Sequence, residues 1–196
     1  MTNLIDKYLL FRIRTKRDPE AFAKLYDRYV MAIFRFVFLK LPSREAAEDV
    51  TSEAFLRCWQ WIQQNREISN FRALLYRIAR NLVADNYRKT KENFSLDAQV
   101  VTETEFATST IVLGDIADGR QGQKVIEARA ELSLVIQRVA KLKEDYQDVV
   151  TLRLVDGLDF GDIAQVLEKT PGHVRVIYHR AMKTLQKMGD GGTKTT

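Results

Sequence analysis

The spacing of apolar side chains constrains this chain most, because it follows the helical period over much of the length. Apolar residues recur every three or four positions in 19–41, 43–64 and 69–89. No stretch shows the alternation typical of a strand. Proline usually interrupts a helix, but here each one stands near a predicted helix start, where its missing N–H costs little: Pro19, Pro42 and Pro171. The sequence therefore predicts an all-α fold.

The helical pattern is interrupted at 92–125. This stretch carries six acidic residues and two basic ones, for a net charge of −4, and its apolar residues show no period. A structureless segment of this length is unusual inside one compact domain, so we interpret it as a linker. The simplest view is a flexible tether.

The linker divides the chain into two small helical domains. The first covers 1–91, with Asp18 and Ser43 as expected helix caps and a basic arm before Asp18. The second covers 126–188, with helices expected at 126–142, 144–156, 160–168 and 171–188. Residues 189–196 are expected to form a flexible tail.

The end of the second domain has the pattern of a helix-turn-helix. Asp159 can cap the first helix, Thr170 can cap the second, and Pro171 occupies the first position of that second helix. At 100° per residue, the charges on the outer face of the second helix are all positive. A helix of this kind fits the major groove of DNA. The alternative is an ordinary amphipathic helix with a solvated basic face. The expected DNA contacts are Thr170, His173, Arg175, Val176, His179, Arg180 and Lys183.

The 69–89 helix carries a second stripe opposite its apolar one. Tyr76, Arg80, Val83 and Tyr87 line up there, and Arg72, Arg77 and Arg88 flank them. Aromatic rings interleaved with arginine suit single-stranded or melted DNA, since bases stack on rings and cations follow the phosphates. The alternative, equally weighted from composition, is that both tyrosines pack on a neighbouring helix and the arginines are solvated.

Nothing in the sequence points to catalysis, a metal or a cofactor. Phosphate-binding glycine loops and hydrolase motifs are missing, and His173 and His179 lie six residues apart, which does not place them on one helix face. Cys58 is the only cysteine, so no internal disulfide can form. We found no signal peptide and no apolar run long enough to cross a membrane. We therefore expect a cytoplasmic protein that is not an enzyme and is not inserted in a membrane.

Four segments together resemble the extracytoplasmic-function (ECF) sigma factors of bacterial RNA polymerase. In order, they are DPEAFAKLYDRYVMAIFRFV, AAEDVTSEAFLRCWQ, NFRALLYRIARNLVADNYRK and the helix-turn-helix. The resemblance implies that the 43–64 helix docks on the clamp of the polymerase β′ subunit, with Asp49 and Glu53 at acidic positions of the docking motif. The acidic first half of that helix is also explained by the helix dipole alone.

The resemblance further implies how promoter DNA is read. The C-terminal domain would read the minus-thirty-five element, and the region from 65 to 88 would melt and read the minus-ten element. Further partners would be the β subunit and an anti-sigma factor. A stand-alone helix-turn-helix regulator remains the alternative. The expected minus-ten contacts are Asn70, Phe71, Arg72, Tyr76, Arg77, Arg80, Asn81, Tyr87 and Arg88.

Some positions depart from the usual pattern of these sigma factors. Ser52 replaces a common glutamine in the docking helix, and Leu74 a common tryptophan. Glu168 stands at a turn position often held by glycine, where a left-handed backbone costs other residues about 1 kcal/mol.

Overall fold

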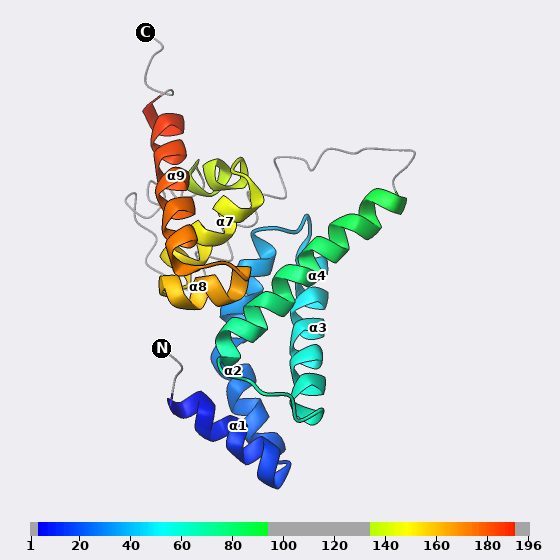
Figure 1. Cartoon of the computed structure of the whole chain (residues 1–196). Helices are drawn as coiled ribbons and strands as arrows, with labels where there is room; N and C mark the ends of the chain where they lie inside the picture. Colours follow the sequence, from blue (N-terminus) through cyan, green and yellow to red (C-terminus); the bar gives the residue numbers. More distant parts are fainter. Residues whose placement is uncertain (1–3, 94–133, 191–196) are drawn as a thin grey trace, which may run out of the picture.

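The computed structural model describes residues 4–93 and 134–190, and all regular elements in these ranges are helices (Figure 1). The all-α prediction is therefore confirmed for the described chain. The predicted linker falls almost entirely outside these ranges, as do residues 191–196 of the predicted tail. The N-terminal module contains α1 (Leu4–Lys16), α2 (Pro19–Phe38), α3 (Arg44–Gln63) and α4 (Phe71–Asn93).

The C-terminal module begins, within the described residues, with a helical stretch at 134–140. It continues with α7 (Glu144–Val150), η1 (Thr151–Val155), α8 (Phe160–Leu167) and α9 (Pro171–Asp190). The sequence predicts one helix over 144–156, but the structure turns from α into a π-helix at Thr151. The Asp156 N–H reaches back five residues to the Thr151 carbonyl at 3.2 Å, which widens the turn.

The predicted helix caps are confirmed. Asp18 accepts hydrogen bonds from the N–H groups of Glu20 and Ala21, and Ser43 accepts one from Ala46 at 3.2 Å. Each cap satisfies backbone donors that the first turn leaves without a helical partner. The sequence thus sets where α2 and α3 begin.

The helix-turn-helix is capped in the same way. Asp159 Oδ1 accepts from the Asp162 N–H at 2.8 Å, and Thr170 Oγ1 accepts from the His173 N–H at 3.3 Å. These bonds mark the starts of α8 and α9. The position of the second helix therefore follows from local sequence.

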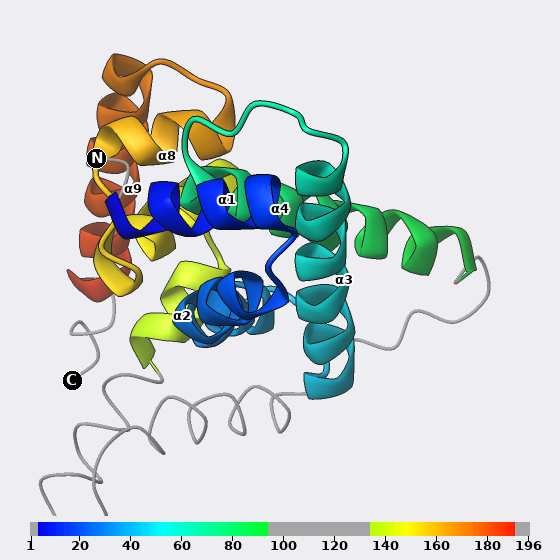
Figure 2. The same cartoon turned by 90° about the horizontal axis from the view of Figure 1, so that it is seen from below.

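The residues before Asp18 form a packed helix, which the expectation of a basic arm did not include. Leu9, Leu10 and Ile13 of α1 are buried against the rest of the N-terminal module. The Tyr29 hydroxyl donates to the buried Asp6 carboxylate, which joins α1 to α2. Figure 2 shows α1 lying across this module. The basic residues of α1 obscured its apolar face in the sequence.

The two modules pack together rather than standing apart. Both views place α7, α8 and α9 on the side of α2 and α4 that faces away from α3 (Figures 1 and 2). One cluster of buried apolar side chains runs from Phe36 and Tyr76 in the N-terminal module to Leu152 and Ile163 in the C-terminal one. We call this packing, in which α7, η1 and α8 cover α4, the closed arrangement. The contact between the two modules is therefore partly apolar.

The turn between α8 and α9 confirms the expectation for Glu168, whose backbone is left-handed at φ 53° and ψ 41°. We expect Glu168→Gly to be more stable to urea than Glu168→Ala by about 1 kcal/mol, because glycine adopts this conformation without a Cβ penalty. Both variants lose the Glu168 carboxylate, so the alanine variant is the matched control. Equal stabilities would show that the turn carries no backbone strain.

Candidate DNA and protein contact surfaces

The outer face of α9 is exposed, as its sequence predicts. The opposite side is buried through Val174, Ile177 and Ala181. Val176 is apolar yet 45% exposed, so it has little packing role in this structure. All the predicted contacts are exposed: Thr170, His173, Arg175, Val176, His179, Arg180 and Lys183. The helix can enter a groove with this face without rearrangement of the module.

The charges on this face are available for an anionic ligand. Arg175, Arg180 and Lys183 form no ion pair with any described residue. The Arg175 guanidinium lies 5.8 Å from the centre of the Phe160 ring, so α8 partly orients it. Unpaired cations on one helix face are the expected electrostatic footprint of a DNA-binding helix.

A different surface lies on α3. Asp49 is exposed and Glu53 is half-buried, and both fall on one stripe with the exposed Leu56. Glu53 pairs with Arg57 at 2.7 Å on the same helix, and Glu48 pairs with Arg44 at 2.7 Å. No described residue forms an ion pair with Asp49. Of the two acids on this stripe, Asp49 is therefore the one with more to gain from a cationic partner.

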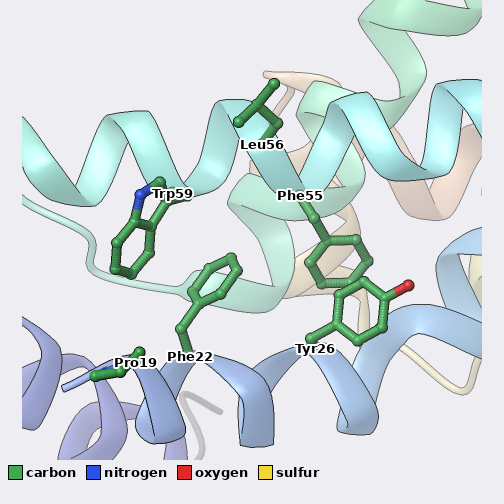
Figure 3. A pocket seen from close by; sticks show the side chains of 6 residues that line it. All are labelled: Pro19, Phe22, Tyr26, Phe55, Leu56 and Trp59. Atoms are coloured by element: carbon green, nitrogen blue, oxygen red, sulfur yellow. The ribbon is translucent and has the colours of Figure 1, made fainter.

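The α3 stripe ends at an apolar groove of about 370 Å³ between α2 and α3 (Figure 3). Phe22 meets Trp59 edge-on at 4.9 Å between ring centres, and Tyr26 meets Phe55 at 4.7 Å. The groove is lined by Pro19, Phe22, Tyr26, Phe55, Leu56 and Trp59. The structure thus places an acidic stripe beside an apolar hollow, an arrangement that sequence reasoning did not predict.

The expected minus-ten residues do not share one exposed face of α4. Phe71 and Tyr76 are fully buried, and Tyr76 packs edge-on against Phe36 at 5.3 Å. In this structure Tyr76 therefore packs on a neighbouring helix, as the alternative interpretation expected. Asn81, Tyr87 and Arg88 are exposed at the far part of the helix. The Tyr87 hydroxyl donates to the Lys40 carbonyl, and Arg88 pairs with Asp85.

The remaining minus-ten candidates face the C-terminal module. Asn70 Nδ2 donates to Asp162 Oδ1 at 2.8 Å, and Arg72 donates to the Asp156 carbonyl. Arg77 pairs with Glu168, and Arg80 pairs with three acids of α7: Glu144, Asp145 and Asp148. Sequence reasoning missed these partners, and the one visible signal was the clustering of three acids at 144–148.

Among the described carboxyl groups, Asp156 has the largest upward shift of its pKa. Burial raises its pKa to about 6, while Arg35, Tyr76 and Arg72 act in the opposite direction. Arg35 Nη2 lies 3.5 Å from Asp156 Oδ1, and the Asp156 side chain has no exposed area. The closed arrangement therefore favours the protonated form of this carboxyl.

The raised pKa predicts a pH dependence of stability. A carboxyl whose folded pKa is raised stabilises the fold below its unfolded pKa, and this contribution is lost as the pH rises through about 6. From about pH 5 to pH 7.5 the loss is about 1.4 kcal/mol. We expect Asp156→Asn to remove this part of the dependence. Urea unfolding of both proteins at each pH measures the difference, and parallel curves would contradict the assignment.

The described residues contain no cluster of histidine, cysteine and carboxylate side chains suited to a metal ion. Cys58 is buried in the N-terminal module, and burial raises the pKa of its thiol to about 12. Such a thiol is a core group rather than a nucleophile. Within the described ranges, every helix is too short or too polar to cross a membrane.

Two family profiles match this chain in the order of its modules. Sigma-70 region 2 matches residues 25–92, and Sigma-70 region 4 matches residues 132–185. The first match covers α3 and α4 up to residue 92, and the second covers the helix-turn-helix. The acidic stripe of α3 and the outer face of α9 therefore lie within the matched residues.

Curated proteins give the same result over more of the chain. The ECF RNA polymerase sigma factor SigW of Bacillus subtilis is 33% identical over 173 residues, covering 88% of this chain and 90% of its own. BldN of Streptomyces coelicolor is 30% identical over 87% of this chain, which spans 61% of BldN. The sigma-E factor of Escherichia coli is 28% identical over 93% of each chain.

A solved structure shows the same fold. CnrH, in complex with the cytosolic domain of CnrY, superposes with a TM-score of 0.66 at 22% sequence identity. The match covers 95% of this chain and 98% of CnrH.

Proposed function

Because this chain belongs to the ECF family of RNA polymerase sigma factors, we propose that α3 docks on core polymerase while α4 and α9 read promoter DNA. Proteins of this family confer promoter specificity on transcription initiation and are not enzymes. The chemistry of RNA synthesis belongs to the polymerase. The site of action proposed for this chain is accordingly the cytoplasm.

The exposed cationic face of α9 carries the DNA-reading part of the proposal. Arg175 and Val176 lie in the first turns of the helix, where they reach base edges when the helix enters the major groove. Arg180 and Lys183 lie further along and reach phosphates, which adds affinity without sequence information. The element read by this face is the minus-thirty-five element, as double-stranded DNA.

The acidic stripe of α3 supports the docking part of the proposal. Asp49, with no ion-pair partner among the described side chains, is placed to meet a basic residue of the β′ clamp, and Leu56 extends the contact into the apolar groove. A charged contact beside an apolar one gives a docking site both specificity and buried area. Contacts with the β subunit belong to the same proposal.

An anti-sigma factor is a further proposed partner. The solved relative CnrH is bound to the cytosolic domain of CnrY. The same kind of partner is proposed for this chain on the strength of family membership.

The proposal is tested by run-off transcription with purified chain, core RNA polymerase and genomic DNA fragments. We expect transcripts with common start sites only when both proteins are present. Failure to form a stable complex with core polymerase would overturn the proposal. Tight, sequence-specific duplex binding without polymerase would instead support a stand-alone helix-turn-helix regulator.

A further inference from the structure

The three cations on the outer face of α9 differ in what holds them. The guanidinium carbon of Arg175 lies 5.8 Å from the centre of the Phe160 ring. In the described part of the chain, the side chains of Arg180 and Lys183 meet no aromatic ring and form no ion pair. Arg175 is therefore the cation on this face whose position is restricted before DNA arrives.

The ring that holds Arg175 is itself held by two neighbours. Phe160 is the first residue of α8, and its partly buried ring packs against the apolar core. The Tyr178 ring of α9 meets it edge-on, with 5.5 Å between ring centres. The Arg153 guanidinium of η1 lies 4.9 Å from its centre. Side chains of η1, α8 and α9 thus meet at this ring, which cannot swing away without losing contacts to both neighbouring helices.

The backbone that leads into α8 is fixed as well. Arg153 Nη1 donates to the Leu158 carbonyl at 2.8 Å, and the Leu158 N–H donates to the Leu152 carbonyl at 2.9 Å. Leu158 is fully buried, and Asp159 caps α8 at the next position. The backbone immediately before Phe160 is therefore restrained by hydrogen bonds and by burial.

Contact with a ring leaves the hydrogen-bonding groups of an arginine available. A guanidinium that stacks on an aromatic ring does so through its face, while its N–H donors point outward in its own plane. A bidentate contact with a guanine edge needs those donors at a defined position, whereas attraction to a phosphate tolerates a range of positions. A side chain that is already held in place also loses less freedom on binding. A ring contact at Arg175 thus favours base reading over general affinity.

We propose that Phe160 is a positioning residue for base reading: its ring, held by Arg153 and Tyr178, orients the Arg175 guanidinium before DNA binds. The inference rests on the proposed function, because it concerns how α9 reads the minus-thirty-five element. Arg175 touches the base, and Phe160 acts through Arg175. Phe160 therefore contributes to promoter specificity without adding a charge that attracts DNA.

The first test is run-off transcription with the full chain and core polymerase on promoters that carry each base pair in turn along the minus-thirty-five element. Arg175→Ala identifies the position at which base preference depends on Arg175. We expect Phe160→Leu to weaken the preference at that position by about two- to fivefold, the size of an exposed cation–π contact, and to leave the other positions unchanged. Phe160→Tyr keeps a ring and should keep the wild-type preference. Equal preferences for Phe160→Leu and wild type would overturn the proposal.

A double-variant cycle separates positioning from a merely structural role. Because Phe160 acts through Arg175, we expect Phe160→Leu to weaken the preference no further in a chain that already carries Arg175→Ala. Ile163→Val is the matched control, since it shortens a fully buried side chain of the same helix that carries no ring. It should lower stability and leave base preference unchanged. Additive losses in the cycle, or the same loss in Ile163→Val, would count against positioning and in favour of a loosened module.

Nuclear magnetic resonance relaxation tests the inference on the wild-type chain, without any substitution. We expect a higher order parameter for the Nε–H group of Arg175 than for that of Arg180 in the DNA-free full chain, since a described ring restrains the first and not the second. Equal order parameters would overturn the proposal. This comparison also decides the matter if Phe160→Leu fails to fold.

The outcomes for this inference and for the proposed function are distinguishable. Polymerase-dependent transcription with unaltered base preference in Phe160→Leu would overturn positioning and leave the proposed function standing. An equal loss at all positions in Arg175→Ala would do the same, because Arg175 would then read no base. Absence of polymerase-dependent transcription with the wild type would overturn the proposed function, while the order parameters of Arg175 and Arg180 would still test positioning.

Discussion

Reversing one charge on α3 with Asp49→Lys is expected to weaken binding of core RNA polymerase by at least about tenfold. Asp49 is exposed, and no described cation pairs with it, so its carboxylate is available to a partner. A lysine there would face a basic docking site as a like charge, which adds repulsion to the lost attraction. Transcription from any promoter should fall in parallel, because docking precedes DNA reading.

The measurement is titration of labelled core polymerase with each variant, followed by run-off transcription. Asp27→Lys is the matched control, since Asp27 is exposed on α2 about 100° around the helix from the groove residue Tyr26. Glu53→Lys should have a smaller effect, since Glu53 already pairs with Arg57 at 2.7 Å. Equal binding by Asp49→Lys and wild type would place the docking surface elsewhere.

Removing single cations from the outer face of α9 is expected to have the second large effect, on transcription and DNA binding. We expect Arg175→Ala to lower transcription from a promoter with a strong minus-thirty-five element by roughly five- to 150-fold, which corresponds to about 1–3 kcal/mol for a base contact. Lys183→Ala should instead weaken DNA binding about equally on all sequences and reduce its salt dependence by about one counterion. The contrast between the two tests whether the first turns of α9 read bases.

Both variants need a control that removes a cation elsewhere in the C-terminal module. Lys141 is exposed in the turn after 134–140, and its neighbour Leu142 packs in the same buried cluster as Ala181 of α9. The turn therefore lies at the buried side of α9, and Lys141→Ala should leave transcription unchanged. Uniform loss across promoters for Arg175→Ala would reassign Arg175 to a phosphate contact.

Local sequence determined the elements and the C-terminal surface. Asp18, Ser43, Asp159 and Thr170 begin their helices through hydrogen bonds to backbone donors within three residues. The exposed face of α9 follows from helical spacing alone, because that helix buries a single side against its own module. The left-handed Glu168 was also predictable, since the turn geometry is local.

Tertiary structure decided what the sequence left open on α4. Helical spacing grouped Tyr76 with Arg80 and Tyr87, yet it cannot say which neighbours cover each side of a helix. Tyr76 is buried against Phe36, while Arg80 meets Asp148, which lies 68 residues further along the chain. The same holds for α1, whose apolar side emerged only from its packing. Local rules fix helices and caps, whereas burial and long-range ion pairs depend on how the helices assemble.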